Sequence, residues 1–278
     1  MPSALKNMLR IFKAHPSMIV PIFISRLINF GFVMLIALPL IKAYAEGDSS
    51  SSLVKATEGF GINLHSPSLY LIILFLFFIN NIISTLLYSI SIISLLDYFR
   101  AERFSLTKGL KGIFKRFFAI VSWCAINKSI GLVVRLWDAI ADFAEHPLIK
   151  SYNWQHGTFL SLLFILDKNC SPKAAVKKSK ALVQENTEGK LQFSPKISKI
   201  FLKLWLCSTL PLIIALCLYT QKSILIGGLI TTLCWFLISG ISTLFNLIIL
   251  SVFYEHWAHK KQRGGFDEAM LKSIMKSR

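Results

Sequence analysis

The chain has few acidic residues and lacks the motifs by which common enzyme classes are recognised. Its 278 residues include 14 Asp and Glu against 31 Lys and Arg, for a formal net charge of +17. It contains no GxSxG nucleophile motif, no Walker A loop and no Rossmann glycine pattern. The sequence therefore predicts a protein that is not an enzyme and that uses no cofactor.

Cysteine is also sparse, and its five residues do not show the spacing of metal ligands or of a disulfide framework. Four of the five lie in apolar stretches, and no CxxC or Cys–His pattern occurs. Glu255, His256 and His259 would place two imidazoles near a carboxylate, but no fourth ligand and no HExxH motif accompany them. We therefore predict neither disulfides nor a metal site.

The excess of basic residues fits two kinds of partner, nucleic acids and anionic lipid surfaces. No aromatic–basic motif of a known nucleic-acid-binding module is present. The basic residues instead gather in the segments between apolar stretches. The predicted partner is a lipid bilayer with anionic headgroups and not a nucleic acid, and a protein partner is left open.

Charged residues and histidine are absent from the longest apolar stretch, Pro67–Leu96. A helix of this length is about 45 Å long, whereas the hydrocarbon core of a bilayer is about 30 Å thick. Hydrophobic residues make up 54% of the chain, and the mean hydropathy is +0.58. These features predict an integral membrane protein of the all-α class, a polytopic transmembrane helix bundle.

Hydropathy predicts that residues 1–278 form a single transmembrane domain with about six spans. The expected spans are 18–41, 67–96, 117–134, 148–166, 201–219 and 224–254. The fourth is the weakest, because polar residues fill its first half. The segments after spans two, four and six are rich in Lys and Arg, whereas the alternate loops are not. The positive-inside rule then places both termini in the cytoplasm.

Short amphipathic helices are expected at the cytoplasmic surface. Their ranges are 1–16, 105–116, 171–186 and 266–277. Ser171 followed by Pro172 is typical of an N-cap with proline at the first helical position. Lysines on such helices attract anionic headgroups by about 1 kcal/mol each. The candidate headgroup contacts are Lys111, Lys115, Arg116, Lys173, Lys177, Lys178 and Lys180.

The helices that follow spans two, four and six are compatible with three parallel repeats of two spans plus one interfacial helix. Residues 110–115 resemble residues 271–276, and the tripeptide Ser84–Leu86 recurs as Ser242–Leu244. The matches are short, and chance alignment of apolar sequence is the alternative explanation.

Polar residues inside the expected spans are the remaining candidates for function. They are Lys128, Asn127, Asn80, Asn81, Asn246 and Arg26. An ionisable residue within a span is by default a functional hypothesis. However, Lys128 and Arg26 lie near span ends, where long side chains reach the interface, and asparagines bond neighbouring helices together. Packing therefore competes with a polar pathway as the interpretation of this set.

Three segments give the chain a resemblance to a known family. They are residues 5–25, residues 158–186 and the end of span six with the sequence FYEHWA. In this order of parts the chain resembles an uncharacterised family of bacterial six-span membrane proteins, known as a domain of unknown function. The resemblance implies a location in the bacterial inner membrane and supplies no activity.

The sequence thus favours an inner-membrane protein of unspecified molecular activity, with an organisational role or a role in binding a partner or lipid. The alternative is a small transporter or channel-like protein. That alternative would use Lys128 and the mid-span asparagines to carry a substrate.

Overall fold

The described part of the protein is entirely helical, as the sequence predicts. The computed structural model describes residues 2–45, 67–101, 103–144, 158–187, 195–218, 220–262 and 264–274, and no strand occurs among them. The helices are α1 (Pro2–Ala14), η1 (Pro16–Met18), α2 (Ile19–Ala45), α4 (Pro67–Ala101), α5 (Leu106–Ala144), α7 (Ser161–Lys168), α8 (Pro172–Thr187), α9 (Pro195–Ser208), α10 (Leu210–Leu218), α11 (Gln221–His259) and α12 (Glu268–Ile274).

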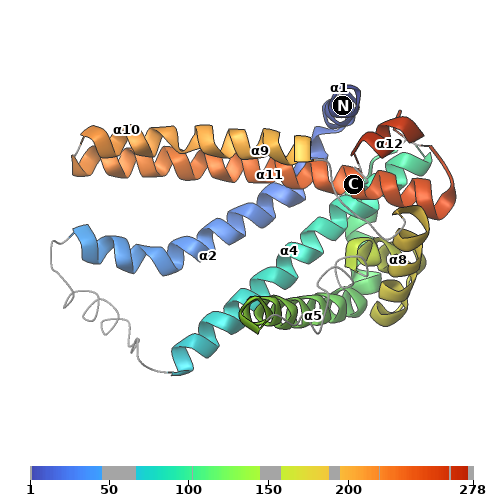
Figure 1. Ribbon diagram of the computed structural model, residues 1–278, viewed down its shortest axis with the longest axis horizontal. Coiled ribbons are helices and arrows are strands. Elements are labelled where there is room, and N and C mark those ends of the chain that lie inside the picture. Colours follow the sequence, from blue (N-terminus) through green and yellow to red (C-terminus); the bar gives the residue numbers. More distant parts are fainter. Residues whose placement is uncertain are drawn as a thin grey trace.

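The long helices spread like a fan from one end of the molecule (Figure 1). α2, α4 and α11 converge near α8 and α12, and their other ends lie apart. α9 and α10 run beside α11 as the second arm of a hairpin. We call the converging end, with α1, α8, α12 and the last turns of α4, α7 and α11, the polar end. We call α2, the first half of α4, α9–α10 and the first half of α11 the apolar arms.

The hairpin of α10 and α11 is held by a close approach of two backbones. The helix breaks at Thr209, next to Pro211, as the proline predicts, because proline has no N–H for the helical bond. Thr220 and Ser223 then cap the start of α11 with reciprocal hydrogen bonds. A Cβ atom on Gly227 would clash with Ala215 and would lie 2.7 Å from the Pro211 carbonyl oxygen. Only glycine fits this contact.

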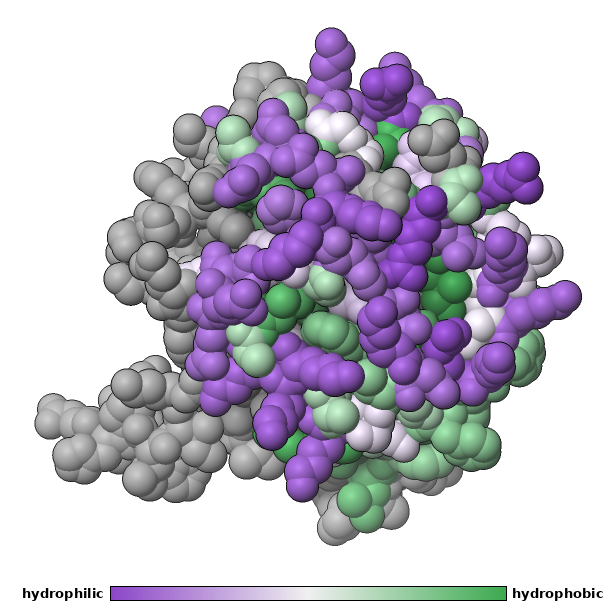
Figure 2. Space-filling model, turned by 90° about the vertical axis from the view of Figure 1, so that its right-hand side faces the viewer, coloured by the Kyte–Doolittle hydropathy of each residue, from purple (hydrophilic) through white to green (hydrophobic). Residues whose placement is uncertain are grey.

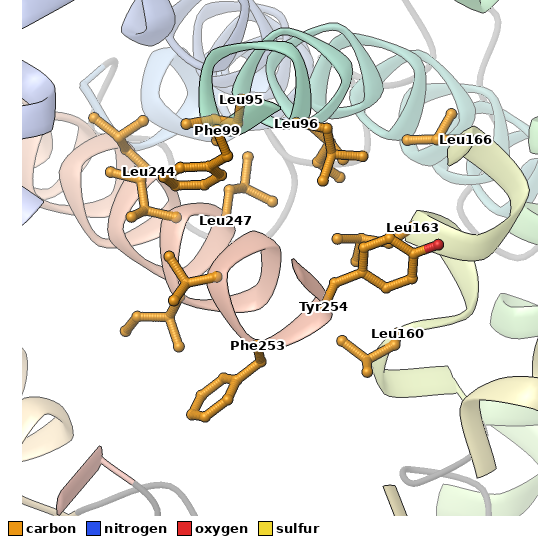
Figure 3. Close-up of a cluster of buried hydrophobic side chains, with 14 of the residues drawn as sticks. Leu95, Leu96, Phe99, Leu160, Leu163, Leu166, Leu244, Leu247, Phe253 and Tyr254 are labelled. Carbon is orange, nitrogen blue, oxygen red and sulfur yellow. The ribbon is translucent and has the colours of Figure 1, made fainter. Parts of the chain in front are cut away.

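The buried core lies at the polar end. Figure 3 shows side chains of α4, of α7 with the preceding Leu160, and of α11 meeting there. Leu95, Leu163 and Tyr254 are each at most 1% exposed. Leu95 and Tyr254 sit near the C-terminal ends of α4 and α11, and Leu163 lies on the short helix α7 beside them, so the tertiary packing is concentrated where the helices converge.

The apolar arms show the opposite pattern, because their large hydrophobic side chains face outward. Phe75 is 62% exposed on α4, Leu218 is 64% exposed on α10, and Leu229 is 69% exposed on α11. Exposed apolar surface on this scale is typical of a protein whose solvent there is lipid.

Within the described ranges, two helices are long and apolar enough to cross a membrane. They cover Leu74–Ala101 and Ile226–His259. A third crossing results if the helices over Ala4–Ala14 and Pro16–Phe32, which meet at a bend of 95°, count as one span. The described residues thus contain two or three helices that could serve as spans, fewer than the six expected.

Two of the expected boundaries differ from the structure. The expected interfacial helix at 105–116 and the expected span at 117–134 are one continuous helix, α5, because no helix-breaking residue separates them. The described part of the expected fourth span, 148–166, contains a break at Leu160, after which α7 has only eight residues. Such a helix is about 12 Å long, too short to cross a bilayer by itself. Residues 148–157 lie outside the described residues.

The amphipathic segments at 1–16, 171–186 and 266–277 do form helices, namely α1, α8 and α12. α8 begins at Pro172, and the backbone N–H of Ala174 donates to the Ser171 hydroxyl at 3.4 Å, as the N-cap prediction requires. Figure 2 looks at this end of the molecule and shows a face dominated by hydrophilic residues. The polar end is therefore chemically distinct from the apolar arms.

The possible repeat has mixed support in the burial pattern. α4, α7 and α11 are each followed by a helix, α5, α8 and α12. Ile113 and Ile274, which the sequence match pairs, are both buried, but Leu110 is 48% exposed whereas its counterpart Leu271 is 2% exposed. A repeat therefore stays a prediction.

Candidate functional site

Three charged residues from three different helices meet at the polar end. Arg100 ends α4, Asp167 ends α7 and Glu255 lies in the last turns of α11. The Arg100 guanidinium donates from Nε to Glu255 Oε1 at 2.8 Å and from Nη1 to Asp167 Oδ1 at 2.6 Å. One arginine thus joins two acids that lie far apart in the sequence. We call Arg100, Asp167, Glu255 and the two side chains described next the charge cluster.

Two further side chains of α11 complete the charge cluster. The Tyr254 hydroxyl donates to Asp167 Oδ2 at 2.7 Å. His259 Nε2 lies 3.3 Å from the same oxygen and 3.1 Å from Arg100 Nη2. The Asp167 carboxylate therefore has a partner for each of its oxygens.

Burial makes these contacts stronger than a surface ion pair. The Glu255 side chain is 1% exposed and that of Asp167 7%, whereas Arg100 keeps 35% of its surface. Burial by itself raises the pKa of Asp167. The hydrogen bonds from Arg100 and Tyr254 and the charges of Arg100 and Lys168 outweigh burial, so the pKa lies well below the usual range of an aspartate. Asp167 is therefore ionised at neutral pH.

The chemistry of the charge cluster is that of a clamp. Its acids are occupied by hydrogen bonds from Tyr254 and from one arginine. Among the described residues, no group of three His, Cys, Asp or Glu side chains is placed to hold a metal ion. The charge cluster binds the ends of α4, α7 and α11 together.

A second polar group lies between the apolar arms, around the predicted residues Asn80 and Arg26. Asn80 donates to Asn29 Oδ1 at 2.5 Å, and Asn29 donates to Ser84 Oγ at 3.0 Å. Arg26 donates to the Thr243 hydroxyl, so α2 is bonded to both α4 and α11. These contacts fit the packing interpretation, in which polar side chains join helices.

The remaining polar candidates do not join this group. Asn81 bonds to the carbonyl of its own helix at Phe77. Lys128 and Asn246 are exposed, on α5 and α11, and Asn127 is half-buried beside Lys128. The structure therefore brings Asn80 and Arg26 into helix contacts and leaves Lys128 and Asn246 on the outside.

The predicted headgroup contacts lie on the outer faces of their helices. Lys111 and Lys115 are exposed on α5, whereas Arg116 is half-buried and bonds to the Gly112 carbonyl at 3.4 Å. On α8 the exposed lysines are Lys173, Lys177 and Lys178, and Lys180 is half-buried. Ala175 and Ser179 on the opposite face of α8 are buried. The amphipathic prediction for this helix is confirmed.

Sequence reasoning missed the charge cluster. From the sequence, Glu255 and His259 are weighed only as metal ligands, and Arg100 and Asp167 count only as charges in the segments between apolar stretches. A usable signal exists, because a basic residue follows shortly after one apolar stretch, at Arg100, and an acid directly follows each of the other two, at Asp167 and Glu255. Pairing across such distances in the sequence still requires the three-dimensional arrangement.

Comparison with family models, with curated proteins and with solved structures found no match for this chain. The structure by itself defines the class: the described residues are all-helical, and two or three of their helices are suited to a membrane.

Proposed function

We propose that this chain is a multi-pass protein of the bacterial inner membrane, with about six spans and with both termini in the cytoplasm. Its role is organisational and not enzymatic. The polar end binds the anionic headgroups of the cytoplasmic leaflet, and its basic surface contacts lipid or a protein partner. The resemblance to the family of six-span bacterial membrane proteins agrees with this proposal.

One observation carries the proposal. Figure 2 shows a hydrophilic face at the polar end, whereas the apolar arms expose apolar side chains. This face carries exposed lysines. On α8 they are Lys173, Lys177 and Lys178, which lie on one side of the helix. Basic residues collected at one end are typical of the cytoplasmic side of a membrane protein.

The transporter alternative lacks such an observation. It requires Lys128 and the mid-span asparagines to share a pathway. Lys128 and Asn246 are exposed on different helices, and Asn80 is engaged with Asn29. A flux measurement in proteoliposomes with Lys128→Ala tests this alternative, and a Lys128-dependent flux would favour it over our proposal.

Reporter fusions test the proposed topology. A fusion after Ser51 follows the first span, and a fusion after Lys178 lies on α8 at the polar end. We expect the two fusions to report opposite sides of the inner membrane, with Lys178 in the cytoplasm. Reports from the same side would contradict the proposed arrangement.

A further inference from the structure

A cleft of about 520 Å³ opens at the polar end and is separate from the charge cluster. It lies between α1, the last turns of α4 and the loop that joins α11 to α12. Its lining residues are Arg10, Ile11, Ala14, Tyr98, Phe99, Gln262, Gly264 and Gly265. Among the described residues, the lining thus combines the cation of Arg10 with aromatic and aliphatic side chains and includes no acid.

The loop that forms one wall is fixed to both helices. Asn7 on α1 donates to the Gly265 carbonyl at 2.6 Å. Gly264 and Gly265 have φ of 62° and 74°, in the left-handed region that favours glycine. A Cβ atom on Gly264 would lie 2.8 Å from the Phe99 ring. The wall of the cleft at Gly264 and Gly265 is therefore held in place by contacts with α1 and α4.

Arg10 supplies an unused cation to this cleft. Its side chain is exposed, and the described residues offer it no hydrogen bond or ion pair. A guanidinium pairs with a phosphate through two parallel hydrogen bonds, which is the strongest contact available to it. The apolar lining next to it suits hydrocarbon. An amphiphilic phosphate fits this combination better than a purely polar one.

The direction of α1 places the cleft at the edge of the apolar arms. The helices over Ala4–Ala14 and Pro16–Phe32 meet at 95°, so α1 lies across the end of α2 instead of extending it. Figure 1 shows α1 beside α12 at the polar end. If α2 crosses the membrane, as the proposed function requires, α1 lies along the headgroup layer.

We infer that this cleft binds one anionic phospholipid. The lipid phosphate pairs with Arg10, and its glycerol and first acyl carbons lie against Ile11, Tyr98 and Phe99. This inference rests on the proposed function, because it requires the polar end to lie at headgroup depth.

Native mass spectrometry of the full chain in detergent, titrated with phosphatidylglycerol, tests the inference. Arg10→Gln removes the charged hydrogen bonds and should weaken binding by about tenfold. Gln262→Trp fills the cleft without changing its charge and should also weaken binding. Lys6→Gln removes an equal charge from the exposed face of α1 outside the cleft and should change the affinity less than about twofold.

Three outcomes would overturn the inference. Equal losses for Arg10→Gln and Lys6→Gln would show general attraction to a basic surface. Unchanged binding by Gln262→Trp would place the lipid elsewhere. Competition by glycerol 3-phosphate at the same concentration as the lipid would assign the cleft to a soluble phosphate. If the reporter fusions show opposite sides of the membrane and one of these outcomes occurs, only this inference fails. If the fusions report the same side, the proposed function fails first.

Discussion

The same long helices contribute to the apolar arms and to the polar end, yet the two regions differ in which side chains they bury. In the arms, Phe75 and Leu229 face outward and few side chains are buried. At the polar end, Leu95, Phe99 and Tyr254 are buried in a dense core around a paired charge cluster. Water drives apolar side chains together only where water is present. The difference therefore supports the proposal that water surrounds the polar end and that lipid surrounds the arms.

The largest expected effect comes from breaking the charge cluster. Arg100→Ala leaves the buried acids Glu255 and Asp167 without their shared cation, which should destabilise the protein by about 3 kcal/mol. Thermal unfolding in detergent measures this loss. Lys260→Ala is the control, because among the described residues the Lys260 side chain makes only an exposed contact of 3.9 Å with Glu185, and it should leave the midpoint nearly unchanged. Equal midpoints for the two variants would show that the cluster does not hold the helices.

Substitution by alanine at two adjacent glycines in the apolar arms should change the stability of the protein in opposite directions. Gly227→Ala places a methyl group against Ala215 and the Pro211 carbonyl, which should cost about 1–3 kcal/mol. At Gly228 nothing lies within 4 Å of the added atom, so Gly228→Ala should stabilise α11 by up to about 1 kcal/mol. Unfolding midpoints of the two variants check this, and a stabilising Gly227→Ala would contradict the close packing of α10 on α11.

Acid should lower the stability of the protein by removing the charge of Asp167 at the polar end. The pKa of Asp167 is lower in the folded protein than in the unfolded chain, where it is about 4. The stabilisation is therefore fully present above pH 4 and is lost as the pH falls toward the folded value. In Asp167→Asn, the unfolding midpoint should start lower at neutral pH and should fall less steeply below pH 4. Parallel curves for both proteins would show that Asp167 does not carry the acid sensitivity.

The smallest effect is expected for single surface lysines. Lys177→Gln on α8 should lower the retention of phosphatidylglycerol by about twofold at low salt, and Lys177→Arg should keep it unchanged. Lipid analysis of the purified proteins measures this. The difference should shrink as the salt concentration rises, since exposed charges are screened. A loss that does not depend on salt would assign Lys177 a different role.

The helices were the part of the structure that the sequence could predict. Uncharged apolar runs such as Pro67–Leu96 form helices because their backbone must satisfy its own hydrogen bonds, and the local signal at Ser171 and Pro172 marks the start of α8 correctly. The number of crossings was harder to predict. Hydropathy separates 105–116 from 117–134, but the backbone continues through both because no residue there breaks a helix.

The candidate site was less accessible to sequence reasoning. The predicted polar residues were judged by depth alone, which groups Asn80 with Asn246. The structure engages Asn80 with Asn29 and leaves Asn246 exposed, because the two residues point from their helices in different directions. The charge cluster depends on Arg100, Asp167 and Glu255, whose contact is set by the convergence of three helices.

Spin-label accessibility in proteoliposomes tests the contrast between the two regions most directly. Labels are placed at Leu229 on an apolar arm and at Lys177 on the polar end, on a background in which the five cysteines are replaced. We predict that the label at position 229 collides with oxygen and is shielded from a water-soluble nickel complex, and that the label at position 177 shows the reverse. Equal access of the nickel complex to both labels would contradict the account.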